Sequence, residues 1–175
     1  MPSAFQSSTG STGAAGATGA TGPTGSGPSY LVLTSDLAAR PNTTLTNTTG
    51  LAFTAATGGY YQFSFGVVFQ SAVTTTGIKL GITFPAATVF AAVVNNPVST
   101  ATDGVTSIFR GFITSSGDAV IGTGVQAINT NYMAQIDGVI LPSTGGTVQV
   151  QHASGVTGSN VTIKQASWGL VNKVG

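Results

Sequence analysis

The sequence predicts an all-β protein, a sandwich or barrel of antiparallel sheets preceded by a short segment of different character. From residue 28 onward, short apolar or alternating runs recur, separated by Gly, Pro, Asn and Thr. No segment shows a sustained apolar stripe of helical period with capping residues. The chain of 175 residues is 41% hydrophobic, enough for one domain with its own core and a small appendage. We therefore divide it into residues 1–9, 10–27 and 28–175.

Residues 10–27 begin with glycine at every third position, namely Gly10, Gly13, Gly16, Gly19, Gly22 and Gly25. This period is the collagen signature, because three polyproline-II chains wound together leave room only for hydrogen at the axis. At roughly 3 Å per residue, five triplets form a rod of about 45 Å, too short to hold three chains together alone. A neighbouring domain must already be trimeric. A flexible linker is the alternative, since only Pro23 favours the helix.

The domain that follows is expected to consist of short strands. The expected ranges are Tyr30 to Thr34, Leu51 to Thr54, Tyr60 to Phe69, Ile78 to Thr83, Val89 to Val94, Thr106 to Thr114, Gly124 to Asn129, Met133 to Leu141, Thr147 to His152, Val161 to Lys164 and Trp168 to Val171. Many short strands at this spacing are typical of sandwiches and barrels.

The stretch GGYYQFSFGVVFQ is the clearest strand. One face is aromatic and aliphatic and is expected to form core, whereas the other carries small and amide side chains; the core face is Tyr61, Phe63, Phe65, Val67 and Phe69. The stretch GTVQVQH repeats the alternation with Val148, Val150 and His152. Outer faces with so few charges do little to prevent association with other sheets. A closed three-fold oligomer would cover these faces and so prevent open-ended aggregation.

Composition excludes several classes of function. The five Lys and Arg residues are scattered, unlike the clusters that bind nucleic acid. No run approaches the roughly 18 apolar residues of a membrane span, and the N-terminus lacks the pattern of an export signal. With no cysteine, disulfides, thiolate chemistry and cysteine-type zinc sites are excluded.

Candidates for chemistry are few. The acids are four Asp residues without any Glu, and His152 is the single histidine. Asp36, Asp103 and Asp118 lie in turn-like settings, which favours local hydrogen bonding, and His152 is expected to be packed or at a subunit interface. A triad using Asp137 stays open on residue types alone, but no nucleophile-elbow motif accompanies it. We expect no enzyme and no cofactor, and we keep a structural cation shared across a three-fold axis as a minor alternative.

Two resemblances can then be stated. A short collagen-like stretch followed by an all-β domain with GGYYQFSFGVVF is similar to proteins with trimeric jelly-roll heads of the tumour-necrosis-factor and complement type, including collagen-like spore-surface proteins. The C-terminal third resembles the closing hairpins of small virion proteins of tailed bacteriophages. The matching features are Asp137-Gly138, Gly146 to Gln151, the loop Ser154 to Asn160, Val161 to Lys164, and Ser167-Trp168-Gly169-Leu170.

The resemblance implies a jelly-roll-like homotrimer that serves as a capsid decoration protein or head fibre on the virion surface. Residues 1–9 would then be the peptide that docks on the major capsid protein or another virion protein, with Met1, Pro2 and Phe5 as apolar anchors. Host-surface glycans are a further expected partner. A tail-fibre or receptor-binding tip and a collagen-like spore-surface protein are the alternatives.

Overall fold

The computed structural model describes residues 27–98 and 107–174, and within them every regular element is a β-strand. The strands are β1 (Ser29–Val32), β2 (Thr46–Ala55), β3 (Tyr61–Ser71), β4 (Ile78–Thr83), β5 (Ala87–Val98), β6 (Ser107–Ile113), β7 (Ala119–Ile121), β8 (Tyr132–Pro142), β9 (Gly146–Ser154), β10 (Val161–Ile163) and β11 (Trp168–Lys173). The all-β prediction is confirmed.

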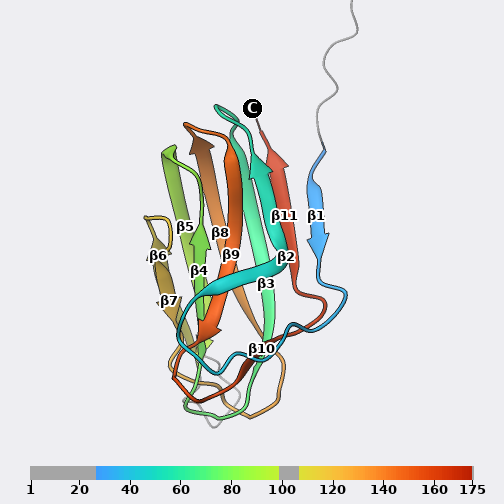
Figure 1. Cartoon of the computed structure of the whole chain (residues 1–175), viewed down its shortest axis with the longest axis vertical. Coiled ribbons are helices and arrows are strands. Elements are labelled where there is room, and N and C mark those ends of the chain that lie inside the picture. Colours follow the sequence, from blue (N-terminus) through green and yellow to red (C-terminus); the bar gives the residue numbers. More distant parts are fainter. Residues whose placement is uncertain (1–26, 99–106, 175) are drawn as a thin grey trace, which may run out of the picture.

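The strands form two antiparallel sheets that face each other (Figure 1). The seven-stranded sheet has the order β1-β11-β3-β8-β5-β6, with β10 also paired to β3. The four-stranded sheet has the order β2-β9-β4-β7. Because β10 and β11 pair with successive parts of β3 while β8 covers its other edge, β3 is held along both sides.

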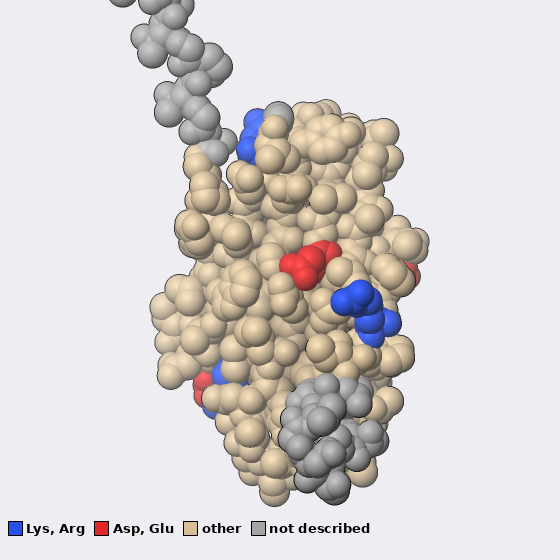
Figure 2. All heavy atoms as spheres, turned by 180° about the vertical axis from the view of Figure 1, so that it is seen from behind, with Lys and Arg blue, Asp and Glu red and all other residues tan. Residues whose placement is uncertain are grey.

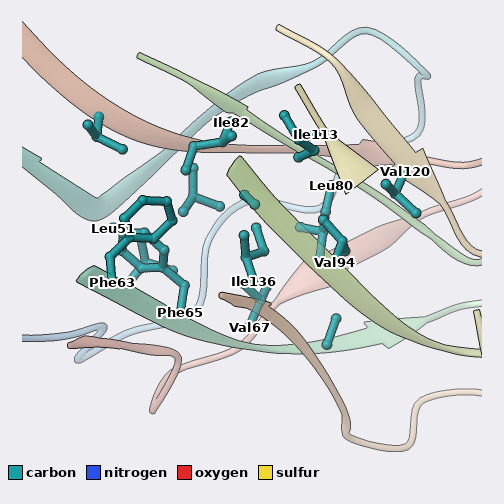
Figure 3. Packing of buried hydrophobic residues seen from close by; sticks show 14 of the residues in the cluster. Leu51, Phe63, Phe65, Val67, Leu80, Ile82, Val94, Ile113, Val120 and Ile136 are labelled. Atoms are coloured by element: carbon teal, nitrogen blue, oxygen red, sulfur yellow. The ribbon is translucent and has the colours of Figure 1, made fainter. Parts of the chain in front are cut away.

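The core lies between the two sheets (Figure 3). The predicted core face of β3 is buried as expected, and it meets inward residues of the opposite sheet such as Leu80 and Ile82. Phe53 of β2 packs against Tyr61, Phe63 and Phe65, with ring centroids 5.7, 5.8 and 6.4 Å apart respectively. Aromatic contacts therefore join the sheets at this end of the core.

The prediction of a strand from Gly124 to Asn129 is wrong, because these residues form a loop. The strand in this part of the chain is β7, which the sequence pattern does not predict. The loop is fixed by single backbone bonds, Val125 N to Thr74 O at 2.8 Å and Asn129 N to Ser71 O at 2.9 Å. Asn129 has a positive φ of 53°, which ends any extended run. Val125 is buried all the same, so its apolar character reflects a loop residue that fills the core.

A crossing segment, residues 33–43, carries the chain from the seven-stranded sheet to the other one (Figure 1). Its backbone is bonded to the C-terminal part of the chain at several points. Leu37 N donates to Ile163 O at 2.9 Å, and Arg40 and Val161 exchange two bonds of 2.8 and 3.0 Å. Asp36 accepts hydrogen bonds from Lys164 and from the backbone N–H of Gln165. The crossing segment is thus fixed against β10.

A bulge interrupts the pairing of β2 with β9 between Asn47 and Ala52. Gly50 adopts a φ of +92°, a conformation that favours glycine. The Gln149 side-chain amide donates to the carbonyls of Thr48 and Leu51, at 3.0 and 3.1 Å, and so satisfies acceptors that the broken ladder leaves free. The bulge also buries the Thr48 side chain, which is 0% exposed.

Trp168 provides a test of packing on the outside of the seven-stranded sheet. A Cβ added to Gly66, its partner across β3 and β11, would lie 2.3 Å from Trp168 Nε1. We expect Gly66→Ala to displace the indole and lower the free energy of unfolding by about 1–3 kcal/mol. Because Trp168 is the single tryptophan, its fluorescence maximum reports the displacement directly.

Gly27→Ala is the matched control, because nothing lies within 4 Å of its added Cβ. It should leave both the emission maximum and the denaturation midpoint at wild-type values. An unchanged emission maximum in Gly66→Ala would show that the ring does not rest on this glycine.

Candidate functional site

The sequence-predicted site residues lie outside the described residues. These are the six stalk glycines Gly10, Gly13, Gly16, Gly19, Gly22 and Gly25, and the anchor residues Met1, Pro2 and Phe5. The site that the described residues do offer consists of two surfaces: one face of the seven-stranded sheet, and a small pocket beside β2.

The outward side of the seven-stranded sheet is here called the outer face. Strand alternation and the register place on it Tyr30, Val32, Gln62, Ser64, Val93, Asn95, Ile108, Arg110, Phe112, Met133, Gln135, Asp137, Trp168 and Leu170. Seen from behind the view of Figure 1, the molecule carries few charged side chains (Figure 2). Asp137 and Arg110 are the charged members of the set just given.

The centre of the outer face is a polar cluster. Ser64 Oγ donates to Asp137 Oδ1 at 2.6 Å, and Gln135 Nε2 donates to the same oxygen at 3.0 Å. The first bond joins β3 to β8, and the second joins two residues of β8. Both partners of the carboxylate therefore belong to its own sheet. The cluster therefore leaves the outer face polar at its centre without exposing a free acid there.

Both edges of the outer face are apolar and exposed. Tyr30 on β1 is 77% exposed and Phe112 on β6 is 74% exposed. Val32 shares β1 with Tyr30, Ile108 shares β6 with Phe112, and exposed Met133 lies on β8. A cavity of about 240 Å³ is lined by Asn95, Pro97, Ile108, Met133 and Gln135. Large apolar side chains left this exposed on one sheet face mark a candidate protein interaction surface.

The aspartates differ in their roles. Asp118 accepts a hydrogen bond from Ser115 N at 2.8 Å, so the prediction of a turn-shaping role is confirmed. Asp36 does not act locally: its partners Lys164 and Gln165 are remote in sequence, and the Lys164 ammonium holds the pKa of Asp36 below its ordinary value. Asp103 lies outside the described residues.

His152 is packed inside the four-stranded sheet, 1% exposed, as expected. Its Nδ1 is 2.9 Å from Thr48 Oγ1, and its Nε2 is buried without a hydrogen-bond partner. Burial, with a smaller contribution from the charge of Arg40, lowers the pKa of His152 to about 4. The hypothesis of a catalytic triad that joins His152 to Asp137 is wrong. Asp137 faces outward from the opposite sheet and is hydrogen-bonded to Ser64 and Gln135.

The pocket beside β2 was not anticipated from the sequence. It has a volume of about 200 Å³ and is lined by Leu37, Ala38, Arg40, Asn47, Thr49 and His152. The crossing segment supplies three of these residues, β2 supplies two, and β9 supplies His152. Because β9 is distant in sequence from the other two segments, no local motif predicts that they meet.

In the part of the chain that the structure describes, no group of three or more His, Cys, Asp or Glu side chains is placed to hold a metal ion. Among the same residues, none forms a helix of the length and hydrophobicity needed to span a bilayer.

Comparison with known proteins adds no assignment. No protein-family model matches the chain, and no curated protein matches it in sequence.

Because His152 is buried as the neutral form, acid should destabilise the fold. The unfolded chain binds a proton near pH 6.5, whereas the folded chain resists protonation until about pH 4. Stability is therefore complete above pH 6.5 and falls as the pH drops to 4, by up to roughly 3 kcal/mol. Urea unfolding at pH 7 and at pH 4.5 measures this loss.

His152→Phe is the matched variant, since it keeps an aromatic ring and removes the titration. We expect a modest change of stability at pH 7 and a much flatter pH dependence down to pH 4.5. Asp36 does not confuse the measurement, because its stabilising contribution is lost only as the pH falls below its ordinary pKa of 3.8. An equal acid loss in wild type and variant would contradict the role given to His152.

Proposed function

We propose that the chain is a trimeric virion structural protein of a tailed bacteriophage, a capsid decoration protein or head fibre. Residues 1–9 dock it on the capsid, residues 10–27 form a collagen-like stalk, and the β-domain projects from the virion surface. The observation that carries the proposal is the outer face, with exposed Tyr30 and Phe112 at its edges and almost no charge. Association of three copies would cover such a face.

The strand order supports a jelly-roll-like head. Without β5, β6 and β10, eight strands remain in two four-stranded sheets, β1-β11-β3-β8 and β2-β9-β4-β7. The connections β1 to β2, β2 to β3 and β3 to β4 each cross from one sheet to the other. Jelly rolls share this arrangement of two four-stranded sheets, and β5 and β6 extend one of them as a hairpin.

The position of β1 supports a stalk at one end of the head. Ser29 pairs with Val171 near the end of β11, so the segment leading from residue 27 enters at the end of the sandwich where β11 finishes (Figure 1). Three chains joined there by a short stalk would point their opposite ends away from the attachment point. That geometry suits a projecting decoration protein.

We infer a structural role without catalysis or a cofactor. Of two potential catalytic groups, Asp137 lies on the outer face of the seven-stranded sheet and His152 is buried in the other sheet, and each has a hydrogen-bond partner in its own part of the fold. In this proposal the protein acts through assembly, either by stabilising the capsid surface or by weak adhesion to the host.

The first test is the oligomeric state. Native mass spectrometry and light scattering of the full chain should show three copies at micromolar concentration. Phe112→Lys combined with Met133→Lys should raise the concentration at which the trimer dissociates at least tenfold, because burying charges without partners is costly. Both side chains are exposed, so the fold of each chain should survive.

Val156→Lys is the control, since it places a lysine at an exposed apolar residue in the loop between β9 and β10, away from the outer face. It should leave the trimer intact. A wild-type chain that stays monomeric and soluble at micromolar concentration would contradict the proposal, as would equal effects of the outer-face and control substitutions.

The second test concerns attachment. One uncharged peptide of nine residues buries too little surface to bind tightly, but three on one stalk gain from effective concentration. Particles lacking the protein should be decorated by the full chain at capsid three-fold or quasi-three-fold positions, as seen by cryo-microscopy. A chain lacking residues 1–9 should bind at least tenfold more weakly.

The arms of this experiment separate the alternatives. Equal decoration by both chains would refute the anchor. Density at the tail tip in place of the head would favour the receptor-binding alternative. Failure of both chains to bind any phage particle would favour the spore-surface alternative.

A further inference from the structure

The pocket beside β2 holds a cation without an acidic partner. Arg40 is half-buried and lines the pocket, and in the described parts of the chain the ion pair that forms is Lys164 with Asp36. A half-buried guanidinium commonly finds a carboxylate or another planar acceptor, because its five N–H donors match that geometry. Here Arg40 lines a pocket of about 200 Å³.

The pocket is held in shape by the backbone. Arg40 is bonded to Val161 through both its N–H and its C=O, and Leu37 N is bonded to Ile163 O. On the other side, Gln151 Nε2 donates to Asn47 Oδ1 at 3.0 Å, a bond in which the Nδ2 donors of Asn47 take no part. Little reordering is needed before a ligand can bind.

The charge of the pocket selects among anions. Arg40 contributes one positive charge, and His152 contributes none at neutral pH because burial lowers its pKa to about 4. One positive charge complements a monoanion such as a carboxylate. A phosphate monoester, with a charge of about −1.5 to −2 at pH 7, would exceed it.

The remaining walls match a sugar ring. Asn47 and Thr49 offer hydrogen-bonding groups of the kind that meet hydroxyls, while Leu37 and Ala38 form an apolar side for the C–H groups of a ring. The volume of about 200 Å³ is below the roughly 300–1,000 Å³ of sites for drug-sized ligands, so it suits one monosaccharide unit.

We propose that this pocket binds the carboxylate-bearing sugar unit of an acidic glycan, a uronic acid, with Arg40 holding the carboxylate. The pocket lies toward the end of the sandwich that is opposite Ser29. His152 pairs with Thr46 at the start of β2, and β2 runs from there toward the end where Ser29 lies. The assignment rests on the proposed function only in that a projecting head meets host glycans; the pocket itself belongs to a single chain.

The single histidine makes the test site-specific. In an NMR titration of the full chain with glucuronate, the ring signals of His152 need no assignment, because no other histidine is present. They should shift saturably, with a dissociation constant on the order of millimolar. Glucose, which lacks the carboxylate, should leave them in place up to the same concentration. N-acetylglutamate amidated at its α-carboxyl, so that a single carboxylate remains, tests a peptide carboxylate and should bind at least severalfold more weakly than glucuronate.

Arg40→Gln should weaken glucuronate binding about tenfold or more, because a paired hydrogen bond to a charged group is lost. Arg110→Gln is the matched control: it removes the other arginine of the chain, which lies on the outer face and is bonded to Asn95. It should bind as the wild type does. If Arg40→Gln does not fold, Arg40→Lys tests the same contact and should bind severalfold more weakly, since an ammonium lacks the planar fork.

The proposal is overturned if glucose shifts the signals as glucuronate does, if no ligand shifts them, or if the Arg40 variant binds normally. If the N-acetylglutamate derivative bound more tightly than glucuronate, the ligand would be an acidic peptide and not a sugar. None of these outcomes alters the oligomeric state, so the trimeric virion role stands or falls separately in the mass and decoration experiments.

Discussion

The alternation of side chains along β3 is the constraint on which the rest of the structure depends. Its aromatic residues and Val67 enter the core, and its backbone pairs with β8 on one side and with β10 and β11 on the other. A shift of one residue in register would turn Phe63 and Phe65 outward and bring Gln62 and Ser64 into the core. The packing of Phe53 from the opposite sheet and the position of Trp168 above Gly66 both follow from this one register.

Scarcity of charge shapes everything outside the core. Where many proteins would place Lys and Glu, this chain uses amides and hydroxyls bonded within their own sheet, as in the contacts of Gln149 with the bulge and of Ser64 with Asp137. Such groups neither repel a second sheet nor require a counter-ion. Because charges are few, the surroundings of each one can be compared. Lys164 forms an ion pair with Asp36, whereas Arg40 lines a pocket.

Strand positions were predictable from the sequence because alternation and turn residues are local signals. The expected strands other than Gly124 to Asn129 coincide with observed ones, although β2 and β5 run longer than their apolar parts. The error arose because Val125 is apolar and buried for a tertiary reason, while β7 is only three residues long. Burial of His152 was predictable from its place after Val148 and Val150. Its meeting with Arg40 was not, because it depends on the path of the crossing segment and on the β2 bulge.

The pairing of β1 with β11 has a practical consequence for attaching cargo to this domain. Val174 N is bonded to Tyr60 O, so the last described residue lies at the same end as Ser29. If the proposed stalk forms at that end, a protein fused after Val174 would emerge beside it and crowd the base of the proposed trimer. The loops between β3 and β4 and between β9 and β10 lie at the opposite end. Peptide epitopes inserted there would be carried at the end of the domain that is remote from Ser29 and Val174.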